Sequence, residues 1–375
     1  MLSSSLDAID GARACILDVA EVTAGENVLI LCEQSIRVEP EAIDLLAIVA
    51  KEAGASVQVL WTDQLRHSWW EDVPRIALSA FQSADVVIHC HYTIGRPHRP
   101  ISDAIASGVR FVRNYATDMR TLSSDWARFP MGLYDVIEEQ ITNRLEKAEN
   151  FRVVTPNGSD VQGRMARRVA LPYFQAEART MSKSLHRVFP PGVFMPINVI
   201  DANGIYMVDN VISWGARIWG LPEISFTPTK LTIENGRVVH VEGEWADQFR
   251  HAFDYVATKA KVGDDAWLID SFHSGLHPRA MTPIHPQIDP DLYWHNMHHH
   301  PQFFHFHIGG DMLRDYGTPY MTHISSGAMN ATLYVDGEPL YIDGKLAILA
   351  DAELRAIAEN FGDPNELFLQ RPVWT

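Results

Sequence analysis

Histidine is the residue type through which this sequence of 375 residues most clearly offers chemistry. Ten of the seventeen histidines lie between His273 and Ser325. They are His273, His277, His285, His295, His298, His299, His300, His305, His307 and His323. Imidazole is the commonest metal ligand in proteins, and its unperturbed pKa lies near neutrality. This density therefore indicates a metal site, acid–base chemistry or both.

Two short segments of this region arrange their polar residues as β-strands do. In residues 303–310 apolar residues alternate with histidines, so we expect His305 and His307 on one face of a strand. The opposite face then carries Phe304, Phe306 and Ile308. Further along the chain the pattern repeats, with His323 and Ser325 sharing a face. Two strands with paired polar groups would form the floor of a metal site.

Four other histidines of the region stand in a different context. Residues 294–301 contain four histidines, show no strand alternation and end at Pro301. We interpret this run as a polar surface loop, in which histidines are enriched without binding a metal.

Composition excludes several classes of protein. The length predicts two domains, or one large domain with insertions, and 46% apolar and 21% charged residues are ordinary for a globular chain. A net charge of −16 argues against general binding to nucleic acid or anionic membranes. Three cysteines without a CxxC motif form neither a disulfide framework nor a cysteine zinc site. With no signal peptide and no long apolar run, we expect a cytoplasmic protein.

The first 150 residues predict an α/β domain with a parallel sheet. Short apolar runs that alternate with helical segments are typical of βαβ units. The runs are residues 28–32, 56–61, 84–90 and 108–113. Polar residues follow the third run, among them Arg96, His98 and Arg99, and ligands of open α/β sheets bind beyond such strand ends. No GxGxxG motif follows the first run, so a dinucleotide site is not supported.

Residues 151–375 predict an α+β domain with β-hairpins that carries the metal site. Asn235-Gly236 favours a type I′ turn, because both central residues of that turn need positive φ. A second hairpin is expected around Gly337-Glu338. Residues 186–196 are interpreted as a rigid proline-rich loop, and residues 267–272 as a strand that runs into His273.

The order of several short motifs resembles the aminopeptidase T-type metallopeptidases and their relatives, the 2,5-dihydroxypyridine 5,6-dioxygenases. The similarity spans about residues 150–345. Its motifs are residues 155–160, 189–196, 233–239, 274–278 and 307–310, and His323 followed by residues 334–338. The resemblance implies a metalloenzyme.

Departures from the peptidase pattern bear on the type of metal site. Where the peptidases have Glu inside Pro-Gly-Glu-Val, this chain has Gly192-Val193. Their second Glu corresponds to His273, and their final His-x-Asp to His323-Ile324-Ser325, with Ser in place of Asp. A two-metal site needs bridging carboxylates, so the loss of three of them argues against a dinuclear hydrolase.

The resemblance to the dioxygenases implies a single ferrous ion instead. Its ligands would be His273, His307 and His323. Asp270 or Asp311 could add an oxygen ligand, or the site could consist of three histidines. Zinc is the alternative metal, because it also accepts three histidines and a water.

The same resemblance implies roles for residues around the metal. His98 and His186 resemble two histidines that handle the protons of the substrate, and Ser325 completes the catalytic candidates. Arg96 and Arg99 would bind an anionic ring substituent.

Phe304 and His305 are the remaining candidates for substrate binding, in a pocket with aromatic walls.

These features together predict a mononuclear non-haem Fe(II) dioxygenase. It would use O2 to cleave the ring of a small hydroxylated aromatic or heteroaromatic compound, such as a dihydroxypyridine. One alternative is a single-zinc hydrolase, aminopeptidase-like or acting on another amide, and the other is a binding protein without a catalytic metal. We also expect a homo-oligomer.

Overall fold

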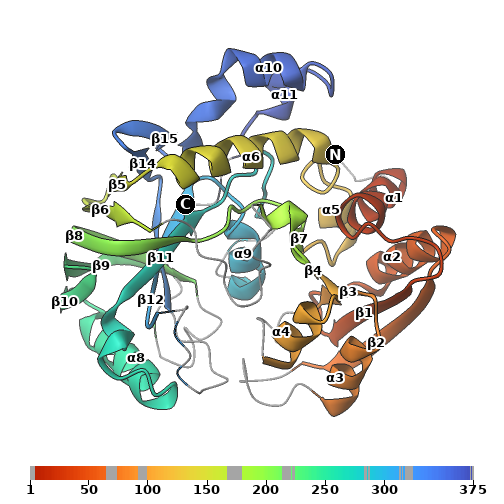
Figure 1. The fold of residues 1–375 in the computed structure, drawn as a ribbon, viewed down its shortest axis with the longest axis horizontal. Helices are drawn as coiled ribbons and strands as arrows, with labels where there is room; N and C mark the ends of the chain where they lie inside the picture. Colours follow the sequence, from red (N-terminus) through yellow and green to blue (C-terminus); the bar gives the residue numbers. More distant parts are fainter. Residues whose placement is uncertain are drawn as a thin grey trace.

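The chain forms two β-sheets, one in each half of the molecule (Figure 1). The computed structural model describes residues 5–64, 74–91, 99–166, 180–212, 221, 224–282, 285, 288–311, 314, 316, 324–371 and 373. No helix among these residues is long and apolar enough to cross a membrane.

The first sheet is parallel and has five strands in the order β2-β1-β3-β4-β7. The strands are β1 (Asn27–Gln34), β2 (Ser56–Asp63), β3 (Val86–Cys90), β4 (Arg110–Asn114) and β7 (His186–Phe189). Helices cover both faces, because successive side chains of a buried parallel strand point to opposite sides. On one face pack α1 (Ser5–Arg13) and α2 (Pro40–Glu52), and on the other α3 (Arg75–Gln82) and α4 (Arg99–Ala106).

The second sheet has eleven strands and pairs in antiparallel fashion. Its strands are β5 (Asn150–Val154), β6 (Asp160–Met165), β8 (Ile197–Ile212), β9 (Ile224–Glu234), β10 (Arg237–Glu242), β11 (Ile269–Ser274), β12 (Phe303–Ile308), β13 (Ile324–Met329), β14 (Thr332–Val335), β15 (Glu338–Ile342) and β16 (Lys345–Leu346). The long strand β8 pairs with β6, β9, β11 and β13. It therefore links the hairpins of this half to the strands that carry the histidines.

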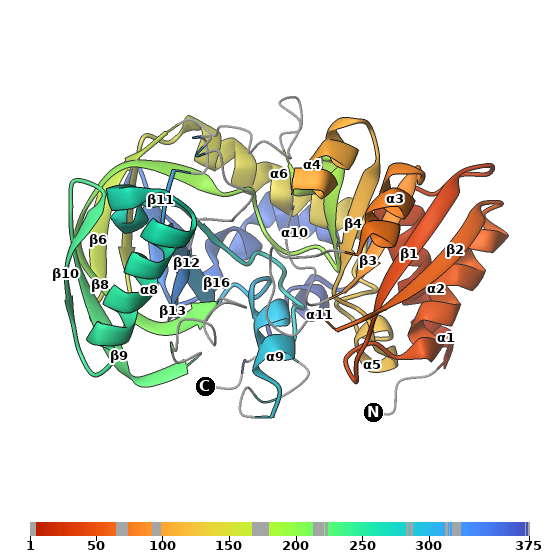
Figure 2. The same ribbon diagram turned by 90° about the horizontal axis from the view of Figure 1, so that it is seen from below.

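Helices connect and cover the two halves (Figures 1 and 2). Packed against the second sheet in one large core are α6 (Met131–Lys147) and α8 (Ala246–Lys259). Between the halves lies α9 (Pro290–Met297). The short helices are α5 (Met119–Leu122), α10 (Ala352–Ala358) and α11 (Pro364–Leu367).

The structure confirms the predicted fold class, an α/β half with a parallel sheet and an α+β half with hairpins. Asn235 and Gly236 have φ of 49° and 76°, as the predicted type I′ turn requires. The hairpin of β14 and β15 turns through Asp336 and Gly337, which also have positive φ.

Two predictions about loops were wrong. Residues 186–189 form strand β7, which pairs in parallel with β4 and forms one edge of the first sheet. Residues 290–297 form helix α9, and the following His298, His299 and His300 are buried, not in a surface loop. The domain boundary at residue 150 stays a prediction: the second sheet begins there, but β7 joins the first sheet from beyond it.

Candidate metal centre

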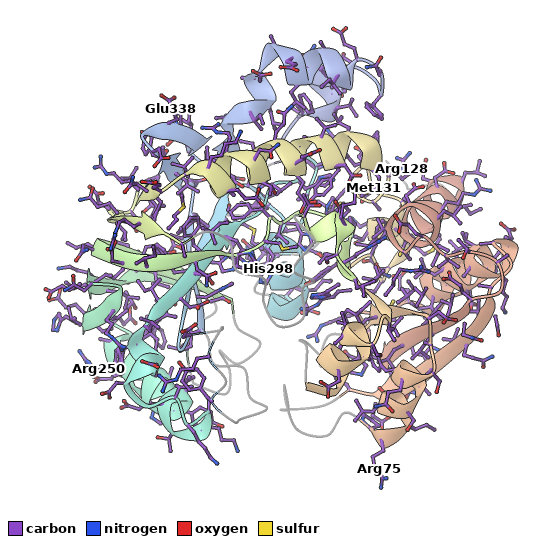
Figure 3. All side chains as sticks on the ribbon, viewed as in Figure 1. Arg75, Arg128, Met131, Arg250, His298 and Glu338 are labelled. Carbon is purple, nitrogen blue, oxygen red and sulfur yellow. The ribbon has the colours of Figure 1, made fainter. Side chains whose placement is uncertain are left out.

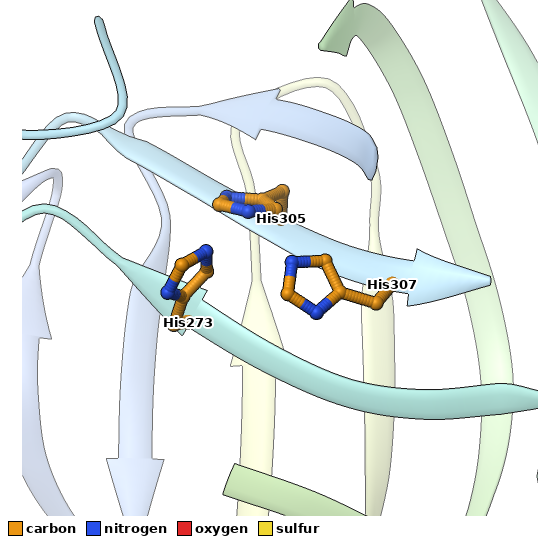
Figure 4. Close-up of side chains that lie close together, drawn as sticks. All are labelled: His273, His305 and His307. Carbon is orange, nitrogen blue, oxygen red and sulfur yellow. The ribbon is translucent and has the colours of Figure 1, made fainter. Parts of the chain in front are cut away.

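Three buried imidazoles meet on two neighbouring strands of the second sheet (Figure 4). His273 lies on β11, and His305 and His307 lie on β12. Alternate residues of a strand share a face, and His273 is directly opposite His305 in the antiparallel pairing. The local pattern of β12 and the register with β11 are therefore sufficient to bring the three rings together.

The spacing of the rings suits a single metal ion. The candidate ligand atoms of His273, His305 and His307 all lie within 4.8 Å of one another. Nitrogen atoms bound to one tetrahedral ion at about 2.1 Å are roughly 3.4 Å apart. Small side-chain rotations would therefore bring all three nitrogens to a common ion.

Hydrogen bonds orient two of the three rings. The Ser271 hydroxyl lies 2.9 Å from His307 Nδ1 and donates to Asp270 Oδ2 at 2.7 Å. His273 Nδ1 makes a longer contact of 3.4 Å with the carbonyl oxygen of Phe194. Each contact favours a proton on Nδ1, which leaves the Nε2 lone pair of the ring suited to bind a metal.

Aromatic rings line the cluster of three histidines. The ring centroid of His305 lies 5.0 Å from that of Phe303 and 5.5 Å from that of His298. His298 follows α9 and lies in the middle of the molecule (Figure 3). The Phe194 ring meets His273 edge to face at 6.3 Å. Such walls exclude water and strengthen electrostatic interactions inside the site.

The donor set is neutral, nitrogen-rich and of intermediate softness. Imidazole suits zinc, iron, copper and nickel, whereas magnesium and calcium prefer oxygen ligands. Among the described residues, no carboxylate joins the three histidines as a candidate ligand. The chemistry of the donors thus fits a single transition-metal ion.

The structure brings together two of the three predicted ligands, His273 and His307. His323 lies outside the described residues, so the predicted ligand set of these three histidines stays a prediction. The third member of the observed group is His305, which the sequence had suggested for substrate binding. The alternation of residues 303–308 was the signal for it, because it places His305 on the same face as His307.

Ser325 lies beside this group. It is buried on β13 directly opposite His307, on the side away from Ser271. Asp270 approaches His307 only through the Ser271 hydroxyl, and the backbone N–H of Asp311 donates to Tyr316 Oη. Neither carboxylate belongs to the candidate ligand group of the described residues, and the composition of the full ligand set stays a prediction.

Two other candidates lie away from the imidazoles. His186 is on β7 of the first sheet, where its ring packs 5.3 Å from Phe111. Phe304 points into the core of the second half, against Phe272 and Tyr206. Strand alternation explains the position of Phe304, because it directs neighbours of the metal-facing histidines to the opposite side.

The remaining candidates, Arg96, His98 and Arg99, follow β3 in the sequence. Arg96 and His98 lie outside the described residues. Arg99 begins helix α4, and the structure does not describe its side chain. Their proposed roles stay predictions.

Further buried histidines are packing elements. The His299 ring meets Tyr115 and Trp126 edge to face, at 4.7 and 5.1 Å, where the two halves join. Burial lowers the pKa of His299 to about 3. Burial also lowers the pKa of His300 to about 4, and its Nε2 donates to the Arg371 carbonyl at 2.6 Å. His277 stacks on Tyr134, and burial lowers its pKa well below the usual value.

The architecture is that of a two-sheet α/β protein with a histidine cluster on the antiparallel sheet. No family model matches the sequence, and no curated protein matches it. Solved structures do match. The 2,5-dihydroxypyridine dioxygenase of Pseudomonas putida KT2440 has a TM-score of 0.62 and 16% identity, covering 92% of this chain and 98% of its own. AmpT from Thermus thermophilus has a TM-score of 0.56 and 12% identity, covering 91% and 99%. The inferred resemblance is thus confirmed at the level of the fold.

Proposed function

We propose that the protein is a metal-dependent enzyme, and specifically a mononuclear non-haem Fe(II) dioxygenase that cleaves the ring of a small hydroxylated aromatic. The observation that carries this proposal is the set of three buried imidazoles without a carboxylate among the described ligand candidates. The fold shared with the dihydroxypyridine dioxygenase supports the choice of reaction.

In this proposal the histidines bind the metal and the neighbouring phenylalanines exclude water. His273, His305 and His307 would hold the ion through nitrogen and leave coordination positions open. A bound ferrous ion would supply binding positions for the substrate hydroxyl and for O2. Phe303 and Phe194 would exclude water beside the imidazoles.

A single-zinc hydrolase is the second candidate. It is supported by the fold shared with AmpT and by the ability of zinc to take three histidines and a water. The described ligand group does not separate the two candidates, because three imidazoles accept zinc as well as iron.

Metal content and oxygen consumption separate the two candidates. Protein purified without oxygen is analysed for iron and zinc, loaded with one equivalent of either metal, and given 2,5-dihydroxypyridine in an oxygen electrode. We expect O2 uptake matched to loss of substrate with iron and none with zinc. Turnover of an aminoacyl p-nitroanilide without O2, with zinc alone, would establish the hydrolase instead.

His305→Ala, His307→Ala and His298→Ala test the assignment of ligands in the same assay. The first two should abolish metal retention and O2 uptake, whereas His298→Ala should retain the metal. Retention of stoichiometric iron by both ligand variants would refute the proposed centre. The predicted homo-oligomer is tested separately by light scattering of the metal-loaded protein.

A further inference from the structure

Behind His307 a short chain of hydrogen bonds leads to a buried carboxylate. Asp270, Ser271 and His307 are exposed by only 4%, 1% and 1%. The bonds along the chain are 2.7 and 2.9 Å. Strand β11 changes register between Ile269 and Ser271, so Asp270 sits in a β-bulge beside the site.

The donors and acceptors of these hydrogen bonds determine which nitrogen of His307 carries a proton. An ionised carboxylate only accepts hydrogen bonds, and a serine hydroxyl has one proton to donate. Because Ser271 donates to Asp270, its oxygen is left to accept from His307, which must then carry a proton on Nδ1. The nitrogen that remains basic in His307 is Nε2.

We propose that Asp270 and Ser271 are positioning residues for the metal. Ser271 orients the ligand His307, and Asp270, hydrogen-bonded to Ser271, supplies a negative charge that partly balances the charge of the ion. This inference rests on the proposed function, in which His307 is a metal ligand. The three imidazoles of the described ligand group are neutral and do not balance the two positive charges of an ion, and the Asp270 carboxylate lies behind one of these imidazoles, that of His307. Through Ser271, the charge of Asp270 makes His307 a more basic ligand for the ion.

His273 provides a comparison within the same site. Its Nδ1 faces a neutral carbonyl, that of Phe194, at 3.4 Å, which is long for a hydrogen bond. The contact of His307 with the Ser271 hydroxyl is shorter, and this hydroxyl is itself fixed by its bond to the Asp270 carboxylate, so the His307 ring is held more firmly. These hydrogen bonds thus connect Asp270 to His307 through Ser271.

Metal affinity tests the inference with Co²⁺ and Zn²⁺ as probes, each in competition with a chromophoric chelator. Losing a partner behind a ligand typically weakens metal binding by about 10- to 100-fold. We expect a weakening in this range for Ser271→Ala and about 10-fold for Asp270→Asn, which keeps an acceptor but removes the charge. Ser271→Thr should bind within about threefold of the wild type, because it restores the hydroxyl.

Ser274→Ala is the matched control. Ser274 is a buried serine of the same strand, but its hydroxyl donates to the Phe303 carbonyl at 2.6 Å. Its removal should leave affinity within about threefold of the wild type. Equal affinities of wild type, Ser271→Ala and Asp270→Asn would overturn the inference.

A readout without metal separates this inference from the proposed function. In apo protein with ¹⁵N-labelled histidine, we expect the His307 ring to carry its proton on Nδ1, and to lose this preference in Ser271→Ala. A proton on Nε2 in the wild type would overturn the inference even if O2 uptake were found. The expected affinities without O2 uptake would uphold it and refute the dioxygenase. If Ser271→Ala fails to fold, Asp270→Asn and Ser271→Thr give the same comparison.

Discussion

Buried neutral histidines outside the metal centre should make this protein lose stability in mild acid. The pKa values of His299 and His300 are lowered from 6.5 to about 3 and about 4, with burial as the main cause. In the unfolded chain both regain an ordinary pKa, so between these values the unfolded state binds more protons. The free energy of unfolding is therefore unaffected by the titration of these two histidines well above pH 6.5, and it decreases as the pH falls below 6.5.

The size of this loss follows from the pKa values. At pH 5 an unfolded imidazole with a pKa of 6.5 is stabilised by protonation by about 2 kcal/mol, whereas a folded one with a pKa of 4 is hardly affected. His299 and His300 together should therefore lower the free energy of unfolding by about 4 kcal/mol between pH 8 and pH 5. Carboxylates contribute mainly below this range, because their unfolded pKa values are near 4.

Urea unfolding of wild type and His300→Gln at both pH values checks this reasoning. Glutamine can still donate to the Arg371 carbonyl but does not titrate. The variant should be less stable at pH 8, and its loss on going to pH 5 should be about 2 kcal/mol smaller than that of the wild type. His251→Gln, at an exposed position of α8, is the control and should show the wild-type loss. An equal loss in wild type and His300→Gln would refute a neutral buried His300.

Three further predictions concern single positions. His305→Ala should weaken Co²⁺ binding by more than about 100-fold in chelator competition, since losing a direct ligand costs more than losing a partner behind it; unchanged affinity would contradict a ligand role. Gly275→Ala should destabilise the fold by about 3 kcal/mol or more in urea, because its Cβ would lie 2.2 Å from the His299 carbonyl carbon. A mild effect would mean that this contact is looser. Asp351→Ala should cost about 1 kcal/mol in thermal unfolding, because Asp351 caps α10 through the N–H groups of Glu353 and Leu354, and Asp351→Asn should restore most of it.

The sequence allowed the metal-bearing strand to be predicted, but not the full composition of the centre. Alternation in residues 303–308 correctly placed His305 and His307 on one face of β12. Alternation gives the face of a side chain and not its distance from residues on other strands. The pairing of His273 with His305 is a long-range register, which only the folded sheet defines.

Residues 294–301 were predicted to form a surface loop because histidine is a polar residue. Histidine counts as polar, yet neutral imidazole packs on aromatic rings and bonds to backbone carbonyls. His299 packs against Tyr115 and Trp126, and His300 donates to the Arg371 carbonyl. These partners are distant in sequence from residues 294–301, so no local sequence pattern could predict the burial of these histidines.

The three imidazoles occupy two strands that pair directly, and none of them comes from the first sheet. These three imidazoles therefore come together once β11 and β12 have paired, whether or not the parallel half has formed. An ion present during synthesis would favour that pairing by mass action. Metal binding would in this way favour early formation of the antiparallel sheet, before any substrate binds.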